Sequence, residues 1–322
     1  MKVLFTADIH IKLGQKNVPV DWAINRYNLL GDRLVELSEQ VDLIIVGGDI
    51  FDRAPTTEEM EVYYDLVAKL PKPTIIYSGN HEANKKTTTF LSHLKKSTSR
   101  NNSLVTIIDT FATVHGIDFI PYNMLKQFVS GEYDYTFEGR ILCTHIRGEI
   151  PPHVKPEIDL DLVAGWDVVL AGDLHSYTNS QANILYPGSP VTTSFHRNEV
   201  DTGVIIFDTD SLEHTWEVLN LPQLLRKTVA AGEELVPTSY HHTIYDIEGD
   251  MAQLAGVEDN DLIDKKINTR SAASEAALIL EPEMTLEMEV SEYLRYILEL
   301  RDDTVESAIK ELGEYNDEIY SI

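Results

Sequence analysis

Five short polar clusters each stand directly after an apolar run of strand length, and this pattern constrains the fold most. The clusters are Asp8–His10, Gly47–Asp52, Gly79–Glu82, Cys143–His145 and Gly172–His175. The runs before them are rich in Val, Ile and Leu with little alternation, as in strands buried on both faces. Ligands of open α/β sheets bind at the carboxyl ends of the strands. We therefore expect the five clusters to converge at one edge, although they span 168 residues of sequence.

Helical patterns separate the first strand-like runs. Apolar residues recur at helical spacing over Ile24–Glu39 and over Glu58–Leu70, where Thr56 and Glu59 form a candidate capping box. The expected strands are Val3–Thr6, Leu43–Val46, Thr74–Tyr77, Ile141–Thr144, Val168–Ala171, Ile184–Tyr186, Val204–Phe207 and His214–Leu219. Alternating strands and helices predict a layered α/β fold, and the later succession of strands predicts a mixed sheet or two packed sheets.

The spacing within the clusters suits metal binding. Residues i and i+2 of an extended chain point to the same side, so Asp8 and His10 could hold one ion, as could Asp173 and His175. A mixture of carboxylate, imidazole and amide ligands favours Mn, Fe, Zn or Mg over a thiolate-binding metal. Seven such side chains suffice for two ions if one carboxylate bridges them, at the spacing of roughly 3.5–4 Å found in two-metal hydrolases.

Taken in order, these motifs resemble the calcineurin-like metallophosphoesterase superfamily. The matching motifs are D-x-H from Asp8, G-D-x-x-D around Asp49, G-N-H-[DE] around Asn80, a lone histidine at His145, and G-x-x-H ending at His175. Within the superfamily, GGDIFDRAP from Gly47 and YPGSP from Tyr186 are similar to the SbcD-type nuclease, over about residues 1–220. The compact length suggests a phage-encoded version.

The resemblance implies a fold and an activity. The fold would be α/β, a metallophosphoesterase layered β-sandwich flanked by helices, with a small α/β capping domain and a helical C-terminal tail. Residues 1–222 would form the nuclease domain, 223–280 the capping domain for DNA recognition, and 281–322 the tail that binds an ATPase partner. The implied activity is that of a metal-dependent DNA exonuclease and endonuclease with a two-metal mechanism, serving DNA repair, recombination or replication.

The same resemblance assigns roles to the clustered side chains. One ion would be held by Asp8, His10, Asp49 and His175, and the other by Asp49, Asn80, His145 and Asp173. His81 would act as a general acid or charge stabiliser near the substrate phosphate. Asp173 departs from the family pattern, which usually has histidine there. Either Asp173 is a substitute ligand that favours harder ions, or one metal is weakly held. The implied cofactors are two divalent ions, expected to be Mn, with Mg as the alternative.

Charge is distributed unevenly along the chain. Taken alone, the net charge of −27 argues against a nucleic-acid binder, because phosphate contacts normally need lysine and arginine. However, Ala83–Ile108 contains no acidic residue, and its basic side chains are candidate DNA contacts: Lys85, Lys86, Lys95, Lys96 and Arg100.

Residues 281–322 carry 13 acidic residues against three basic ones, which form either a solvated face or a surface for a basic partner. The resemblance implies that this tail docks on the coiled-coil base of an SbcC-like ATPase. It also implies a homodimer of catalytic domains, and so a heterotetramer with the ATPase.

The single cysteine, Cys143, excludes a disulfide framework, and no run of 18 or more apolar residues predicts a membrane span. We expect a cytoplasmic protein, in the host cytoplasm if it is phage-encoded. Two other functions stay open: a metallophosphoesterase acting on small nucleotides or phosphoproteins, and a binding scaffold that has lost its metals. Hydrolysis of a generic phosphodiester, with and without Mn and EDTA, separates an enzyme from a scaffold.

Overall fold

The computed structural model describes residues 1–83, 89–152, 154–230, 233, 235, 240–248, 290–291, 294 and 304–310. The chain divides into two compact units, one of Met1–Arg226 with Pro237–Ile244, the other of Lys227–Val236 with Tyr245–Ile322. Residues 304–310 are helical. Most of the expected capping domain and tail lies outside the described residues, so those two expectations stay predictions.

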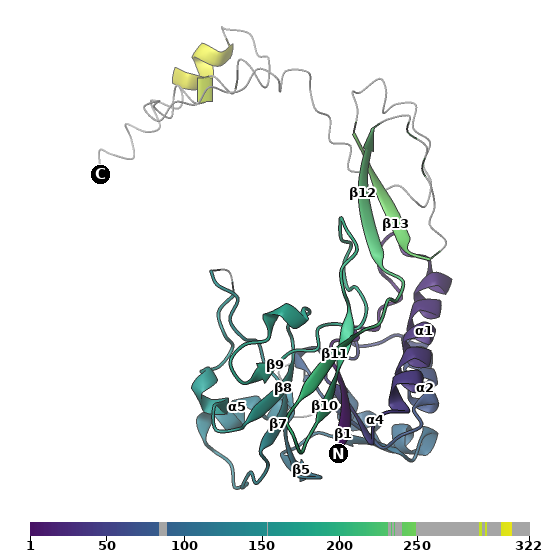
Figure 1. Ribbon diagram of the computed structural model, residues 1–322. Coiled ribbons are helices and arrows are strands. Elements are labelled where there is room, and N and C mark those ends of the chain that lie inside the picture. Colours follow the sequence, from purple (N-terminus) through teal and green to yellow (C-terminus); the bar gives the residue numbers. More distant parts are fainter. Residues whose placement is uncertain are drawn as a thin grey trace, which may run out of the picture. The chain divides into compact units, whose positions relative to one another are not determined.

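Two sheets build the first unit (Figure 1). The six-stranded sheet has the order β11-β10-β1-β2-β3-β4, and the five-stranded sheet has the order β5-β6-β7-β8-β9. Their strands are β1 Lys2–Thr6, β2 Leu43–Gly47, β3 Thr74–Tyr77, β4 Val105–Ile108, β5 Ala112–Val114, β6 Ile117–Ile120, β7 Ile141–His145, β8 Val168–Gly172, β9 Ile184–Leu185, β10 Gly203–Asp208 and β11 His214–Val218. Every expected strand is present within one residue of its predicted bounds, and the prediction of two packed sheets is confirmed.

The direction of the strands decides where the polar clusters end. Strands β1 to β4 run parallel, and β10 and β11 join this sheet antiparallel. In the second sheet β6 to β9 run parallel, and β5 is antiparallel to β6. Since parallel neighbours end at the same edge, the carboxyl ends of β1, β2 and β3 lie together, as do those of β7 and β8.

Three hydrophobic clusters hold the layers together. Side chains of both sheets, among them Phe5, Ile45, Phe119 and Leu170, form the core between them. The other face of the larger sheet packs against helices α1 Val20–Ser38, α2 Thr57–Lys69 and α4 Phe90–Asn101. Helix α5, Tyr122–Ser130, packs on the other face of the smaller sheet. The result is a β-sandwich flanked by helices, as expected.

Helix α2 begins where its capping residues predict. The Thr56 side chain accepts a hydrogen bond from the Glu59 backbone N–H, and the Glu59 side chain accepts one from the Thr56 N–H, so the predicted capping box is confirmed. Helix α1 begins at Val20, four residues before its predicted start. The remaining elements are α3 Asn80–Ala83, the 3₁₀ turns Leu160–Val163 and Tyr177–Asn179, and a two-stranded sheet of β12 Leu224–Ala230 and β13 His242–Glu248.

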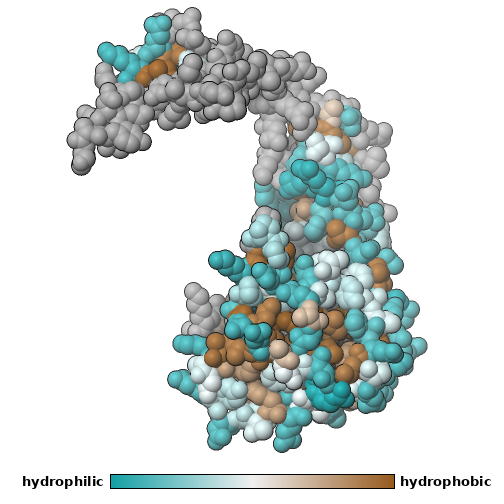
Figure 2. Space-filling view, turned by 60° about the vertical axis from the view of Figure 1, so that its left-hand side comes forward, coloured by the Kyte–Doolittle hydropathy of each residue, from teal (hydrophilic) through white to brown (hydrophobic). Residues whose placement is uncertain are grey.

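On the face that Figure 2 shows, hydrophilic residues surround an apolar area. Within the described ranges, the large hydrophobic side chains that stay exposed are Val20, Leu104, Val129, Leu162 and Tyr240. No helix in this part of the chain is both long and apolar enough to cross a membrane. The homodimer expected from the sequence stays a prediction.

Candidate metal centre

The side chains at the carboxyl ends of β1, β2, β7 and β8 meet across the two sheets. The His145 Nε2 atom lies 3.4 Å from Asp49 Oδ2 and 3.9 Å from Asp8 Oδ1. Asp8 and His145 are completely buried, and Asp49 is nearly so. The structure therefore brings together residues from clusters that are far apart in the sequence.

One half of the centre contains two histidines and two carboxylates. The His10 and His175 Nε2 atoms lie 3.1 Å apart. His175 Nε2 is 3.9 Å from Asp8 Oδ1, and His10 Nε2 is 3.7 Å from Asp49 Oδ2. Ligand atoms of Asp8, His10 and His175 are close enough together that these three residues could hold one metal ion.

The other half is expected from the sequence to contain His145, Asp49, Asn80 and Asp173. Because Asp49 Oδ2 lies within 4 Å of both His10 and His145, it is the carboxylate placed to bridge two ions. His145 Nε2 lies 4.0 Å from Asp173 Oδ1. Asp173 is absent from the three residue groups whose atoms are close enough to hold an ion, which are Asp8–His10–His175, His10–Asp49–His81 and Asp8–Asp49–His145.

Polar atoms without partners show that these residues fit a metal. The His145 Nδ1–H donates to the carbonyl of Gly47 at 2.8 Å, which leaves Nε2 on the side of Asp49 and Asp8. Within the described ranges, this Nε2 and Asn80 Oδ1 are buried and have no hydrogen-bond partner. Buried polar atoms are normally satisfied, so predicted ligand atoms that lack hydrogen-bond partners fit a role in holding cations.

Burial and charge shift the ionisation of the same groups. Burial raises the pKa of Asp8 to about 8, against the opposing effect of His145. Burial also lowers the pKa of His10 to about 3. For His145, burial acts to lower the pKa, but Asp49 and Asp8 raise it well above its usual range. Several buried groups are thus held away from their ordinary ionisation, as expected where cations belong.

The backbone at the centre adopts a conformation that L-residues rarely take. Asp8, His10, Asp49 and Asp173 have φ values of 57°, 48°, 50° and 98°. Gly79 must be glycine, because a Cβ there would lie 2.1 Å from Asp49 Oδ1. Strained backbone of this kind gathers at functional sites, where the surrounding structure enforces it.

Glu82 fixes these loops and is a residue whose role the sequence did not reveal. Its buried carboxylate accepts hydrogen bonds from the backbone N–H groups of Asp49, Phe51 and Gly79 at 2.8–3.0 Å. Burial raises the pKa of Glu82 to about 7. Its position after Asn80 and His81 in the G-N-H-[DE] motif was the available signal.

His81 lies at the mouth of the centre. Its Nδ1–H donates to the carbonyl of Asp52, and its Nε2 lies 3.8 Å from Asp49 Oδ2. The side chain is 36% exposed, so a substrate can reach it. Together with His10 and Asp49 it also forms a group close enough to hold an ion. Its expected role as a non-ligand stays a prediction.

Asp173 is held by an arginine that the sequence did not single out. Arg147 Nε donates to Asp173 Oδ2 at 2.8 Å, and Nη2 donates to Oδ1 at 3.3 Å. The Asp173 N–H lies 3.1 Å from each carboxylate oxygen of Asp8. The hydrogen bond and charge of Asp173 raise the pKa of Arg147.

The candidate DNA contacts lie in and before α4. Lys85 and Lys86 are outside the described residues. Lys95 forms an ion pair with Asp109, while Lys96 and Arg100 are exposed. Their contact with DNA stays a prediction.

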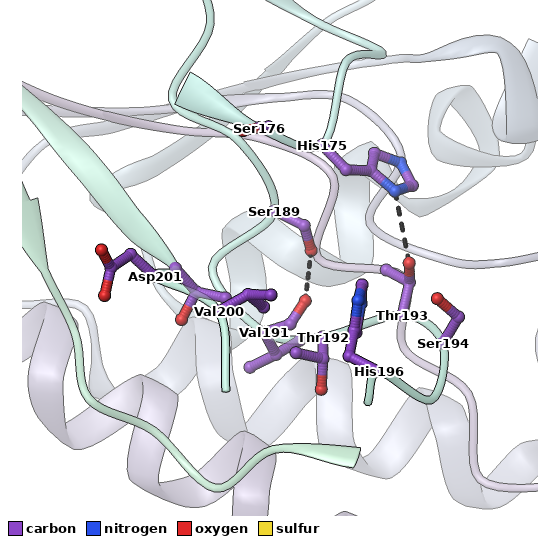
Figure 3. A pocket seen from close by; sticks show the side chains of 11 residues that line it. His175, Ser176, Ser189, Val191, Thr192, Thr193, Ser194, His196, Val200 and Asp201 are labelled. Atoms are coloured by element: carbon purple, nitrogen blue, oxygen red, sulfur yellow. Dashed lines mark hydrogen bonds between the residues drawn. The ribbon is translucent and has the colours of Figure 1, made fainter. Parts of the chain in front are cut away.

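A small pocket adjoins His175 (Figure 3). Its volume is about 200 Å³. It is lined by His175, Ser176, Ser189, Val191, Thr192, Thr193, Ser194, His196, Val200, Asp201 and Thr202. Thr193 Oγ1 lies 3.2 Å from His175 Nδ1 and orients that ring. Six hydroxyls and no lysine or arginine line the pocket, so its chemistry suits a neutral polar group better than a phosphate.

Comparison with known proteins agrees with this geometry. Residues 1–201 match the family model of the calcineurin-like phosphoesterases. The probable exonuclease subunit 1 of Escherichia phage T5 is 41% identical over 334 residues, which cover 98% of this chain and 98% of that protein. A putative phosphoesterase of Invertebrate iridescent virus 6 is 27% identical over 229 residues, covering 64% of this chain and 75% of that protein. The crystal structure of a Thermus thermophilus protein, TT1561, has a TM-score of 0.42 and 10% identity, covering 68% of this chain and 99% of that chain, a likeness too slight to support an argument.

Proposed function

Because the chain belongs to the calcineurin-like phosphoesterase family, we propose that it is a metal-dependent DNA nuclease that hydrolyses phosphodiester bonds. The observation that carries the step from phosphoesterase to nuclease is the likeness, over nearly the whole chain, to a phage protein named a probable exonuclease subunit. The buried donor set at the strand ends supports it, because two divalent ions are the usual means of cleaving phosphodiesters at such sites.

We assign one ion to Asp8, His10, Asp49 and His175, and the other to Asp49, Asn80, His145 and Asp173. Mn is the expected metal and Mg the alternative. Oxygen and imidazole ligands favour these two ions over metals that prefer thiolate ligands. When bound, the ions supply Lewis-acid chemistry, activating water and neutralising charge on the phosphate.

The protein's own groups position this chemistry. The carbonyl of Gly47 fixes the ring of His145, and Thr193 and Ser189 fix the loop around His175 and Asp8. His81 keeps its Nε2 towards Asp49 and would hold a proton for the leaving oxygen. The hydroxyl-lined pocket beside His175 would take the sugar or base next to the cleaved phosphate.

The phage relative is named subunit 1, which supports a partner protein for this chain. We propose that the partner is an SbcC-like ATPase with a coiled coil, bound through residues 281–322. A homodimer of catalytic domains would then give a heterotetramer, acting in the host cytoplasm in DNA repair, recombination or replication.

A nuclease assay on linear double-stranded DNA tests the proposal. The chain would be incubated with Mn, Mg or EDTA, each with and without a candidate ATPase partner plus ATP. We expect Mn-dependent degradation that the partner accelerates. Failure to cleave DNA under every condition, with a small phosphodiester still hydrolysed, would replace the nuclease by a small-molecule phosphoesterase.

A further inference from the structure

Strands β7 and β8 carry an arginine–aspartate pair at each end. Before the strands, Arg140 Nε donates to Asp167 Oδ2 at 2.6 Å. After them, Arg147 Nε donates to Asp173 Oδ2 at 2.8 Å. The two pairs have the same chemistry on the same two strands, but only the second lies at the metal centre. The pair Arg140–Asp167 can therefore serve as a control for the pair Arg147–Asp173.

The Arg147 guanidinium has one engaged edge and one open edge. Of its five N–H donors, Nε and one Nη2 hydrogen bind Asp173. The remaining donors have no hydrogen-bond partner within the described part of the chain. The Arg147 side chain is 44% exposed, whereas that of Asp173 is 6% exposed. A buried carboxylate thus fixes the orientation of a cation whose other side faces solvent.

The Arg147 guanidinium lies close to the predicted ligands through the edge that binds Asp173. Asp173 Oδ1, which accepts from Nη2, is 4.0 Å from His145 Nε2, and the Asp173 N–H lies against the Asp8 carboxylate. The guanidinium is therefore separated from the ligand set by a single carboxylate group. Of the other acids near Arg147, Glu157 raises its pKa by charge, but the Glu157 carboxylate accepts from the Tyr122 hydroxyl.

The negative charge of the centre favours a cation such as the Arg147 guanidinium close to the substrate. Asp8, Asp49 and Asp173 contribute three carboxylates to a site that must accept an anionic phosphodiester. A guanidinium presents its donors in a planar fork that matches two phosphate oxygens, and charge-assisted bonds of this type are the stronger ones. Arg147 offsets the charge of Asp173 and still has donors to offer.

We propose that Arg147 binds a non-bridging oxygen of the phosphodiester to be cleaved, and that Asp173 is the positioning residue that aims it. The inference rests on the proposed function only in that the substrate is a phosphodiester. Stabilisation of negative charge by preorganised donors is often the largest contribution to such reactions. Asp173 can hold Arg147 through Oδ2 and still offer Oδ1 to an ion.

The test compares Arg147→Gln with Arg140→Gln, which removes the arginine of the control pair. Both variants would be assayed on bis(p-nitrophenyl) phosphate and on DNA with Mn. We expect kcat/KM of Arg147→Gln to fall about 100-fold, the loss typical of one removed anion-stabilising donor, and Arg140→Gln to stay within about twofold of the wild type. Equal activity of Arg147→Gln and the wild type would overturn the proposal.

Metal affinity separates substrate binding from a purely structural role. Removing a cation beside two metal ions cannot weaken their binding by charge, so Mn titration calorimetry should show unchanged or tighter binding in Arg147→Gln. An activity loss matched by an equal loss of Mn affinity would overturn the proposal. Guanidinium ion added to Arg147→Ala should restore part of the activity, which it would not do for a collapsed site.

A binding measurement needs no turnover and keeps the two proposals apart. Thymidine 5′-monophosphate should bind the Mn-loaded wild type about tenfold more tightly than Arg147→Gln, the size of one charge-assisted hydrogen bond. Equal affinities would overturn the role of Arg147 whatever happens with DNA. A wild type that binds the nucleotide through Arg147 but leaves DNA intact would overturn the nuclease and keep the role of Arg147.

Discussion

The two ring nitrogens of His81 have different partners, and this difference defines what the residue can do. Nδ1–H is engaged by the Asp52 carbonyl, so only Nε2 is available to the substrate or to an ion. Proximity to Asp49 allows either use. Which of the two applies can be decided with one substitution.

We expect His81→Asn to lower kcat by about 100- to 10,000-fold, the range for loss of a general acid. Mn stoichiometry, measured by calorimetry, should stay the same, because the residue would contribute no ligand. A variant that binds one Mn fewer would instead make His81 a ligand.

Asp173 gives a second prediction at this scale. Histidine at this position matches the usual family pattern, so Asp173→His should keep Mn-dependent cleavage, at a reduced rate because the carboxylate that holds Arg147 is lost. Asp173→Ala should lose most of it, because it removes both a proposed ligand and the support of Arg147. Rates on bis(p-nitrophenyl) phosphate across a Mn series would measure this. Full activity of Asp173→Ala would refute the ligand role.

At the scale of elements, the loops after β2 and β3 pack closely together because Gly79 has no side chain. The Cα of Gly79 lies so close to Asp49 that there is no room for a Cβ atom at this position. Glu82 ties the same loops by three backbone hydrogen bonds. The geometry of the centre therefore depends on residues that touch neither metal nor substrate.

Gly79→Ala should abolish high-affinity Mn binding, because the new methyl group overlaps Asp49 Oδ1. Overpacking of this kind costs about 1–3 kcal/mol of unfolding free energy. Gly165→Ala is the matched control, since its Cβ would meet no atom within 4 Å. Urea unfolding and Mn calorimetry on both variants test this, and wild-type Mn affinity in Gly79→Ala would contradict it.

The strands that carry the site could be predicted because their burial on both faces leaves continuous apolar runs. Their parallel order then brings the polar clusters to one edge. Strands β4, β5 and β6 were not predicted, and for β5 and β6 the physical reasons are clear. β5 has three half-buried residues, and β6 contains the buried Asp118, whose carboxylate accepts from Gly139 N–H and Trp166 Nε1. A charged residue such as Asp118 makes β6 look unlike a buried strand, because the partners that satisfy its carboxylate are distant in the sequence.

The pairing of Arg147 with Asp173 was also beyond prediction. The two residues are 26 positions apart and meet only because β7 and β8 are neighbours. Residue spacing within one helix or strand cannot predict a contact between residues that follow two different strands. By contrast, Asp8 and His10 are close in sequence and share one group of candidate ligands, although both have left-handed φ values in place of the extended chain that the spacing argument assumed.

At the scale of the whole molecule, metal binding and folding should be linked. The fold buries the carboxyl groups of Asp8 and Asp49 almost completely. Ions that bind only the folded form stabilise it by about 2.7 kcal/mol at 100 times the dissociation constant.

We therefore expect Tm to rise with Mn and to fall in EDTA, as measured by calorimetric scans. Because the chain has a net charge of −27, Mn could also bind elsewhere. Asp49→Asn controls for this, since it removes the bridging carboxylate and should lose most of the Mn-dependent rise. The same rise in Asp49→Asn and in the wild type would place the stabilising ions outside the centre.

The four residues of the centre with left-handed φ values lower the stability of the fold while supplying groups needed for activity. Each such conformation costs about 1–3 kcal/mol, so a search for heat-resistant variants would favour glycine at Asp8, Asp49 and Asp173. Every such substitution would delete a proposed ligand. Laboratory evolution under thermal selection alone would thus drive this enzyme towards a sturdier and inert protein, and selection must monitor turnover at the same time.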